Sequence, residues 1–187
     1  EESKALLENW SVTQTGKTDL YIPFFQIAIE CLNLNGIVGY ITVNNFYRSL
    51  NGRAIRTYMS ENRYELKMID FGAEQVFKGR STYTCICIIS KTEGGVRYLK
   101  SKIDQIDKVE DSNFIELPYD TLSDHDGWLL QSPSIASVIR KIESTGIPLG
   151  ECFNIRNGFA TLKNEVFILN IVKIDEKYYH TKASDGN

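Results

Sequence analysis

The chain has 187 residues, of which 21 are Lys or Arg and 24 are Asp or Glu, so its formal net charge is −3. A content of 42% hydrophobic and 11% aromatic residues is typical of a folded globular protein and excludes an intrinsically disordered one. No apolar run approaches the ~18 residues of a membrane helix. No secretory signal opens the sequence, which starts at Glu1 rather than at Met. We therefore expect a cytoplasmic protein without a membrane partner, present here as a fragment or with a processed terminus.

The chain contains four cysteines, Cys31, Cys85, Cys87 and Cys152. Cys85 and Cys87 are two residues apart in a predicted strand, so both side chains should face the same side of a sheet. Their spacing differs from the CxxC pattern of zinc and redox sites. We expect buried, reduced thiols of a cytosolic protein and no metal site.

Charge is distributed unevenly along the sequence. Residues 44–100 hold ten Lys or Arg and five Asp or Glu, whereas residues 101–130 hold two Lys and eight Asp or Glu. This distribution fits a protein in which the basic block forms a face that binds DNA and the acidic block forms a solvated face away from it. Ordinary surface charge is the alternative, and the charges alone favour it.

The first hundred residues alternate between helical and strand patterns. Apolar residues three and four apart predict helices over 19–33 and 49–61. A nearly continuous apolar run predicts a buried parallel strand over 37–43, and apolar and β-branched residues predict strands over 66–71 and 83–90. The helix between the first two strands is typical of a βαβ unit. The short loop before the last strand predicts an antiparallel pair.

Residues 101–130 have the composition of an irregular acidic linker, which we expect Trp128 to anchor by packing. A short amphipathic helix is predicted over 133–144. The apolar residues of this helix form one stripe, and the simplest interpretation is that the stripe faces the core. Its members are Ile135, Val138, Ile139 and Ile142.

From Pro148 onward the pattern changes to short β segments, which we predict over 151–156 and 166–172. We place a domain boundary near residue 147. The tail from Thr181 is polar, and we expect it to fray.

A series of short motifs follows this order of elements. A strand ends in a Gly-x-x-Gly-x-Ile pattern followed by Asn and Phe, a second strand ends Ile-Asp-Phe, and Val-Phe then precedes a strand that opens Thr-Tyr-Thr. In this order and spacing the sequence resembles the C-terminal part of gamma-class adenine-specific DNA methyltransferases, found in type II restriction–modification enzymes that fuse both activities. The stretch Val43-Asn44-Asn45 departs from the family's Pro-Asn, because it lacks the proline. The residues that carry the match are Gly36, Gly39, Ile41, Asn45, Phe46, Ile69, Asp70, Phe71, Val76, Phe77, Thr82 and Thr84.

A second match begins at Pro148. Residues 148–161 contain Leu-Gly-Glu and Ile-Arg-x-Gly, and Val166–Ile168 supplies the strand that follows. This stretch is similar to the opening of a TaqI-like target-recognition domain.

The resemblance implies an α/β fold. Residues 1–100 would form the distal half of a Rossmann-like S-adenosylmethionine-dependent methyltransferase sheet, as the C-terminal half of the catalytic domain. Residues 101–147 would be a linker with a short helix. Residues 148–187 would be the start of a β-rich recognition domain.

The resemblance also implies transfer of a methyl group from S-adenosylmethionine to the exocyclic amine of a target adenine in double-stranded DNA. The family's cofactor loop and its Asn-Pro-Pro-Tyr motif do not occur in this sequence. We therefore expect no catalytic residue here, and we expect the main cofactor site to lie in an upstream part of the parent protein. The chain alone should be inactive.

By resemblance, Phe77 is the stacking wall for a flipped adenine, because such an enzyme must extrude its target base. A core phenylalanine that closes the hairpin is the alternative. Lys78 and Arg80 flank it and would grip phosphates. We assign no catalytic role to Asp70, which more often caps a loop.

Further DNA contacts are expected from residues near strand ends and in the second match. Arg48, Asn51 and Arg53 follow a strand's carboxyl end, where open α/β sheets place their sites. A solvated helix start would explain them equally well. In the recognition domain the candidates are Arg156 and Lys163.

A non-catalytic module for DNA recognition or protein interaction, working with a separate catalytic chain, is the alternative function. Strand 37–43 would lack a neighbour if upstream strands are missing. Its edge is then expected to be covered by another copy of the chain or by a rearranged N-terminus.

Overall fold

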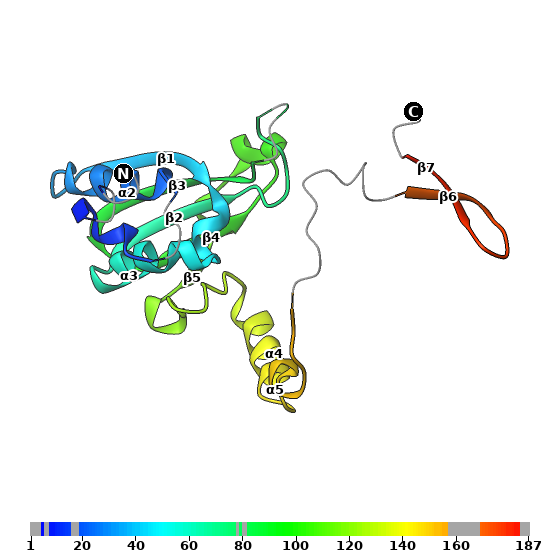
Figure 1. The fold of residues 1–187 in the computed structure, drawn as a ribbon. Coiled ribbons are helices and arrows are strands. Elements are labelled where there is room, and N and C mark those ends of the chain that lie inside the picture. The colour runs from blue at the N-terminus through cyan, green and yellow to red at the C-terminus, as the bar shows by residue number, and fades with distance from the viewer. Residues whose placement is uncertain are drawn as a thin grey trace. The chain divides into compact units, whose positions relative to one another are not determined.

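The structure is a computed structural model that describes residues 5, 8–15, 19–77, 79, 82–156 and 169–183. The chain divides into two compact units, residues 1–139 and 140–187. Figure 1 shows the elements of each unit. The domain boundary expected near residue 147 stays a prediction.

A five-stranded mixed sheet forms the centre of the first unit, with the strand order β1-β3-β2-β4-β5. Strands β2 and β4 pair in parallel, and the other three pairings are antiparallel. The strands are β1 Ile37–Val43, β2 Tyr64–Asp70, β3 Thr84–Glu93, β4 Val96–Lys100 and β5 Ile115–Leu117.

Helix α3, Arg53–Glu61, connects β1 to β2. Both strands are antiparallel to β3, which lies between them, so they run in the same direction as a βαβ unit requires. The predicted antiparallel pairing of β2 with β3 is confirmed. The mixed α/β architecture is also confirmed.

Strand β1 differs from its prediction as a buried parallel strand. Among the described residues it pairs only with β3, in antiparallel register, and forms an edge of the sheet. Ile37 is 68% exposed and Ile41 47% exposed. The prediction was wrong because a continuous apolar run fixes neither strand direction nor how many faces are covered.

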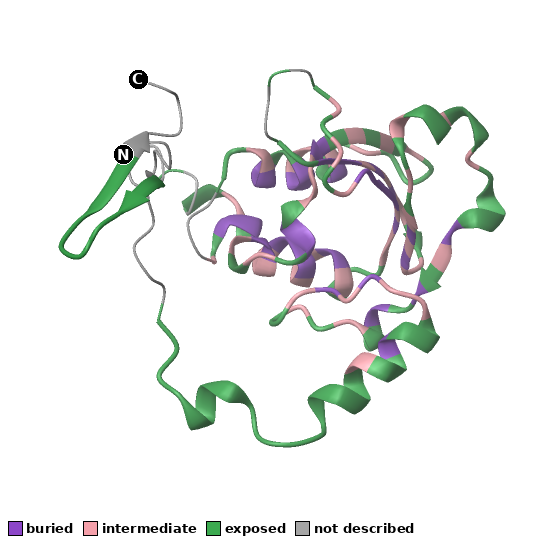
Figure 2. Ribbon diagram, turned by 90° about the vertical axis from the view of Figure 1, so that its right-hand side faces the viewer, coloured by how far each residue is buried: buried purple, intermediate pink, exposed green. Residues whose placement is uncertain are grey.

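One face of the sheet packs against helix α2, Tyr21–Glu30, helix α3 and the short 3₁₀ turn Ser11–Thr13. Figure 2 shows buried residues concentrated between these helices and the strands. Cys85 and Cys87 both face this layer, with their sulfur atoms 3.7 Å apart, which confirms that they share a side. Both are buried free thiols.

Cys31 and Cys152 are exposed, so the expectation of buried thiols was wrong for these two. Cys31 directly follows α2, at a point where the chain is leaving the helical layer. Among the described residues, no cluster of three or more metal-ligating side chains occurs.

The opposite face of the sheet is covered by residues 101–114, which were expected to form part of a linker. Ile69, Phe71 and Phe114 form a second cluster there, beside the 3₁₀ helix Ile103–Lys108. Two further short 3₁₀ helices, Asp111–Asn113 and Tyr119–Thr121, flank β5. The segment is therefore an integral part of this unit.

Trp128 anchors the end of this segment, as predicted. Its side chain is buried, and its ring lies 5.7 Å from the ring of Tyr119 and 6.5 Å from that of Phe46, centroid to centroid. Its indole N–H donates to the Oδ1 atom of Asp124 at 2.7 Å.

Helix α4, Pro133–Glu143, confirms the predicted amphipathic helix but not its core-facing stripe. Ala136 is buried, whereas Ile135, Val138 and Ile142 are exposed. The spacing predicted the helix correctly, since it reports which residues share a face and not whether another element covers that face.

The second unit contains helix α5, Leu149–Cys152, and a hairpin of β6, Leu169–Ile174, and β7, Tyr179–Ala183. A strand had been predicted over 151–156, but Pro148 precedes a helical turn there, a position that suits proline. Thr181 lies in β7 and not in a frayed tail, because its strand pairs with β6. No helix among the described residues is both long and apolar enough to cross a membrane.

Candidate functional site

The carboxyl ends of three strands lie at one edge of the sheet. Strands β1, β2 and β4 run in the same direction and end at Val43, Asp70 and Lys100. A pocket of about 300 Å³ opens there, and we call it the strand-end pocket. It is lined by Asn44, Asn45, Tyr47, Arg48, Asp70, Gly72, Ala73, Tyr83, Tyr98, Lys100 and Gln131.

Asp70 is the hydrogen-bonding centre of this pocket and is 2% exposed. Its Oδ1 atom accepts from the Asn44 side-chain amide at 2.7 Å and from the Gly72 backbone N–H at 2.9 Å. Its Oδ2 atom accepts from the Tyr47 and Tyr98 hydroxyls, each at 2.9 Å. These four donors satisfy the hydrogen-bonding capacity of the buried carboxylate, which thereby joins three separate segments of the chain.

Burial raises the pKa of the Tyr47 and Tyr98 hydroxyls well above the ordinary tyrosine range, and the neighbouring Asp70 charge raises it further. Both phenols therefore stay protonated and continue to donate at neutral pH. Asp70 acts here as a structural hub, and its lack of a catalytic role stays a prediction.

Two cations line the same pocket. The Arg48 guanidinium carbon lies 5.1 Å from the centre of the Tyr47 ring. Lys100 is exposed at the end of β4. Within the described part of the chain, neither side chain pairs with a carboxylate or donates a hydrogen bond.

Phe77 lies in the loop between β2 and β3, which leaves and re-enters the sheet at this edge. Its side chain is 48% exposed, whereas the neighbouring Val76 packs against the second hydrophobic cluster. Lys78 and Arg80 lie outside the described residues. The exposed ring is compatible with stacking on a base, and the role of Phe77 stays a prediction.

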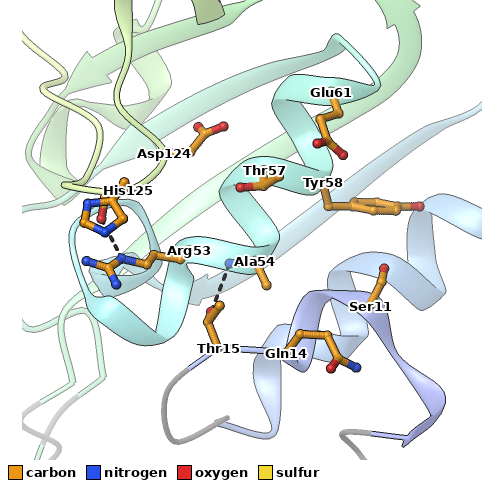
Figure 3. Close-up of a pocket in the computed structure, with 10 residues that line it drawn as sticks. All are labelled: Ser11, Gln14, Thr15, Arg53, Ala54, Thr57, Tyr58, Glu61, Asp124 and His125. Atoms are coloured by element: carbon orange, nitrogen blue, oxygen red, sulfur yellow. Dashed lines mark hydrogen bonds between the residues drawn. The ribbon is translucent and has the colours of Figure 1, made fainter.

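Arg53 lies in a different cavity from Arg48. Figure 3 shows the wall of α3 facing the segment of Ser11, Gln14 and Thr15 across a pocket of about 520 Å³. The Arg53 Nε–H donates to the His125 backbone carbonyl at 2.7 Å. The structure thus separates two arginines that the sequence placed together.

Asn51 lies in the 3₁₀ turn Leu50–Gly52, ahead of α3. In the second unit, Arg156 is exposed and its Nε lies 3.4 Å from the Asn154 Oδ1 atom. Lys163 lies outside the described residues. The roles of all these residues in binding DNA stay predictions.

The loop between β1 and α3 is held by a fully buried arginine. Arg56 donates to the carbonyls of Phe46 at 2.6 Å, Ser49 at 2.9 Å and Asp124 at 2.7 and 2.9 Å. Burial lowers its pKa from the ordinary arginine value. These bonds fix the segment that carries Asn44, Tyr47 and Arg48.

Sequence reasoning missed Tyr98 and Lys100, because no strand was predicted over 96–100. The available signal was an alternation: Val96 and Tyr98 are buried on one face, and Arg97 lies on the other. The Gly94-Gly95 turn before it would have predicted a hairpin between β3 and β4, whereas β4 pairs with β2 and β5.

Comparison with known proteins finds similarity to restriction–modification methylases and type II methyltransferases. Residues 1–77 match the family model described as Eco57I restriction-modification methylase. The chain is 30% identical over 169 residues to the type II restriction enzyme and methyltransferase RM.Eco57I of Escherichia coli, covering 87% of this chain and 17% of that protein. It is 25% identical over 184 residues to the type II methyltransferase M.BstVI of Geobacillus stearothermophilus, covering 85% of this chain and 32% of that protein.

Solved structures share the fold at low identity. A DrdV–DNA complex matches 70% of this chain and 16% of that chain, with a TM-score of 0.54 and 13% identity. A nuclease-deletion mutant of the Type ISP restriction-modification enzyme LlaGI, in complex with a DNA substrate mimic, matches 68% and 15%, with a TM-score of 0.51 and 16% identity. The chain spans only about a sixth to a third of the two sequence relatives. Residues 1–77 thus resemble an Eco57I-like restriction–modification methylase domain, and the chain has homology to part of type II methyltransferases.

Proposed function

We propose that the parent protein transfers a methyl group from S-adenosylmethionine to the exocyclic amine of an adenine in double-stranded DNA, as part of a restriction–modification system. In this proposal the chain is a fragment that contributes the wall for the flipped base and several DNA contacts. The homology to type II methyltransferases across most of the chain carries the proposal. The main cofactor site would lie in an upstream part of the parent.

The position of Phe77 supports the base-stacking role. A duplex hides the amine of adenine, so the base must be extruded and held. Stacking on an aromatic ring contributes about 1–3 kcal/mol per base in single-strand complexes. Phe77 offers a half-exposed ring on the loop that borders the strand-end edge.

Phosphate contacts around this ring would position the DNA without reading its sequence. Arg48 is exposed at the strand-end pocket and suits this role. We keep Asn51, Lys78, Arg80, Arg156 and Lys163 as candidates. Arg53 is the weakest, since its Nε already donates to a backbone carbonyl.

Among the described residues no strand pairs with the outer edge of β1, and this observation supports the fragment role. Unpaired strand edges attract a further strand, and exposed Leu34, Ile37 and Ile41 lie in or near this strand. We propose that an upstream strand of the parent covers this edge, and that the isolated chain self-associates through it. Light scattering that shows a monomer at all concentrations would contradict the second part.

The proposal is tested by incubating the parent protein with S-adenosylmethionine and duplex DNA and identifying the methylated nucleoside by mass spectrometry. We expect N6-methyladenine. Phe77→Ala should lower the rate of methylation roughly tenfold or more, since stacking energy is lost, and Phe77→Trp should restore most of it. A methylated cytosine would refute the adenine specificity. Equal rates for Phe77→Ala and the wild type would refute the stacking role.

A further inference from the structure

We propose that the strand-end pocket binds one phosphodiester group of the DNA strand, with Arg48 and Lys100 as its anion ligands and the Tyr83 ring as the wall for the adjoining sugar. This inference rests on the proposed DNA-methylating function and deepens it. Lys100 and Tyr83 had no role in the predictions made from the sequence.

The ion pairing of Arg48 and Lys100 supports this inference. Both line a pocket of about 300 Å³, and neither has an ion-pair partner among the described residues. By contrast, Arg63, Lys67 and Arg97 on the same sheet all contact carboxylates. Two unpaired cations in one cavity repel each other, and a bound anion would relieve this repulsion.

The Lys100 side chain passes close to Gly72, and this path also supports the inference. A methyl group placed on Gly72 would lie 3.1 Å from the Lys100 Cε atom and 3.7 Å from its Nζ atom. Gly72 also has a φ of +60°, which glycine adopts without strain. The absence of a side chain at Gly72 thus lets the lysine extend across the turn that follows β2.

The carboxylate of Asp70 also lines the pocket, but its oxygen atoms are occupied and do not pair with Arg48 or Lys100. Each of its oxygen atoms already accepts two hydrogen bonds, and the residue is almost fully buried. The pocket therefore holds two cations against one covered carboxylate. This balance favours an anion over a metal ion, which needs several oxygen ligands with free lone pairs.

The other side chains that line the pocket suit a sugar and a phosphate ester. Tyr83 is 48% exposed and lies just before β3, so its ring can contact an apolar or sugar surface. Asn45 and Gln131 add amide groups that can bond to phosphate or sugar oxygens. A phosphate ester with its sugar fits this combination better than an inorganic ion, which would not use the ring.

The test uses the salt dependence of duplex DNA binding, measured by fluorescence anisotropy on the wild-type chain and on Arg48→Gln and Lys100→Gln. The log–log slope of affinity against salt should fall in magnitude by about 0.9 for each phosphate that a variant no longer neutralises. Tyr83→Leu should weaken binding without changing the slope. Arg63→Gln is the matched control, because it removes one positive charge from the opposite end of β2.

The possible outcomes distinguish failure of the pocket assignment from failure of the proposed DNA-methylating function. Salt-dependent binding by the wild type, with unchanged slopes for both Arg48→Gln and Lys100→Gln, would overturn the pocket assignment and leave the DNA role intact. Absence of DNA binding by the wild type would count against the DNA role itself. A titration with inorganic phosphate, followed by the NMR signals of Gly72 and Lys100, distinguishes the sources. Shifts with phosphate, without any effect of the variants on DNA binding, would indicate a free-phosphate site and overturn the proposal.

Discussion

Gly52 determines the shape of the loop that carries the candidate DNA-binding residues. A Cβ atom at this position would lie 1.8 Å from the Phe46 carbonyl oxygen and 2.6 Å from its carbon. Since both are backbone atoms, no rotamer change can relieve the clash. The glycine therefore permits the close approach of α3 to the segment after β1.

Gly52→Ala should therefore destabilise the protein by about 1–3 kcal/mol or more, through backbone displacement. Gly39→Ala is the matched control, because no heavy atom lies within 4 Å of a Cβ at that position. Urea unfolding of both variants measures the difference. Equal stability of the two would show that the loop adapts to a side chain at Gly52.

The buried phenols of Tyr47 and Tyr98, which lie beside the Asp70 charge, give the protein a defined pH dependence. The pKa of each phenol is raised in the folded state. A raised folded pKa contributes stability that is fully present below the unfolded value of about 10 and is lost as the pH rises towards the folded value.

The free energy of unfolding should therefore decline between about pH 9 and pH 11. Tyr98→Phe removes one of the two phenols, so its decline with pH should be shallower although the variant starts less stable. Urea unfolding at several pH values gives both slopes. Identical slopes for the variant and the wild type would mean that Tyr98 does not contribute to the alkaline loss of stability.

At the scale of elements, periodicity predicted α2, α3, β2 and β3 close to their observed bounds, because each buries a regular set of side chains. It also predicted α4, in which only Ala136 is buried. It missed β4 and β5. The strand β5 has only three residues, Ile115–Leu117, and is too short to show a period. Strand β4 places exposed Lys100 directly at its end, where the sequence suggests a loop.

Helix α4 shows the limit of periodicity most clearly. Its amphipathic pattern was recognised, but Val138 and Ile142 are exposed and only Ala136 is buried. A pattern of apolar residues defines a face, and only the rest of the fold decides whether that face is covered.

Ile142→Glu should consequently change the free energy of unfolding by less than about 0.5 kcal/mol, as for an ordinary surface site. Ala136→Glu, on the same helix, should cost about 2 kcal/mol or more, because it buries a charge without a partner. Urea unfolding compares them. A large loss for Ile142→Glu would show that the exposed face is covered in solution.

At the scale of the whole molecule, no local pattern could have predicted the strand-end pocket. Asp70 is joined to Asn44 across 26 residues, to Tyr47 across 23 and to Tyr98 across 28. Such contacts depend on the strand order, in which β3 lies between β1 and β2. The sequence did indicate Arg48, because it follows a strand end, whereas Phe77 came from the family resemblance and its role stays a prediction. The sequence also placed Arg53 beside Arg48, but the two line different pockets.

The relation of the chain to a larger enzyme rests on homology at this scale. The first unit contains a mixed sheet whose outer strands, among the described residues, are β1 and β5, and the relatives extend well beyond the matched region. We propose that the chain supplies the distal part of a methyltransferase sheet and DNA contacts, whereas the cofactor binds mainly upstream.

A calorimetric titration with S-adenosylmethionine tests this claim most directly, on the 187-residue chain and on a form extended upstream into the parent protein. We expect tight binding by the extended form only, with no measurable heat of binding for the shorter chain. Tight binding by the 187-residue chain alone would contradict the account, because it would place the cofactor site within these residues.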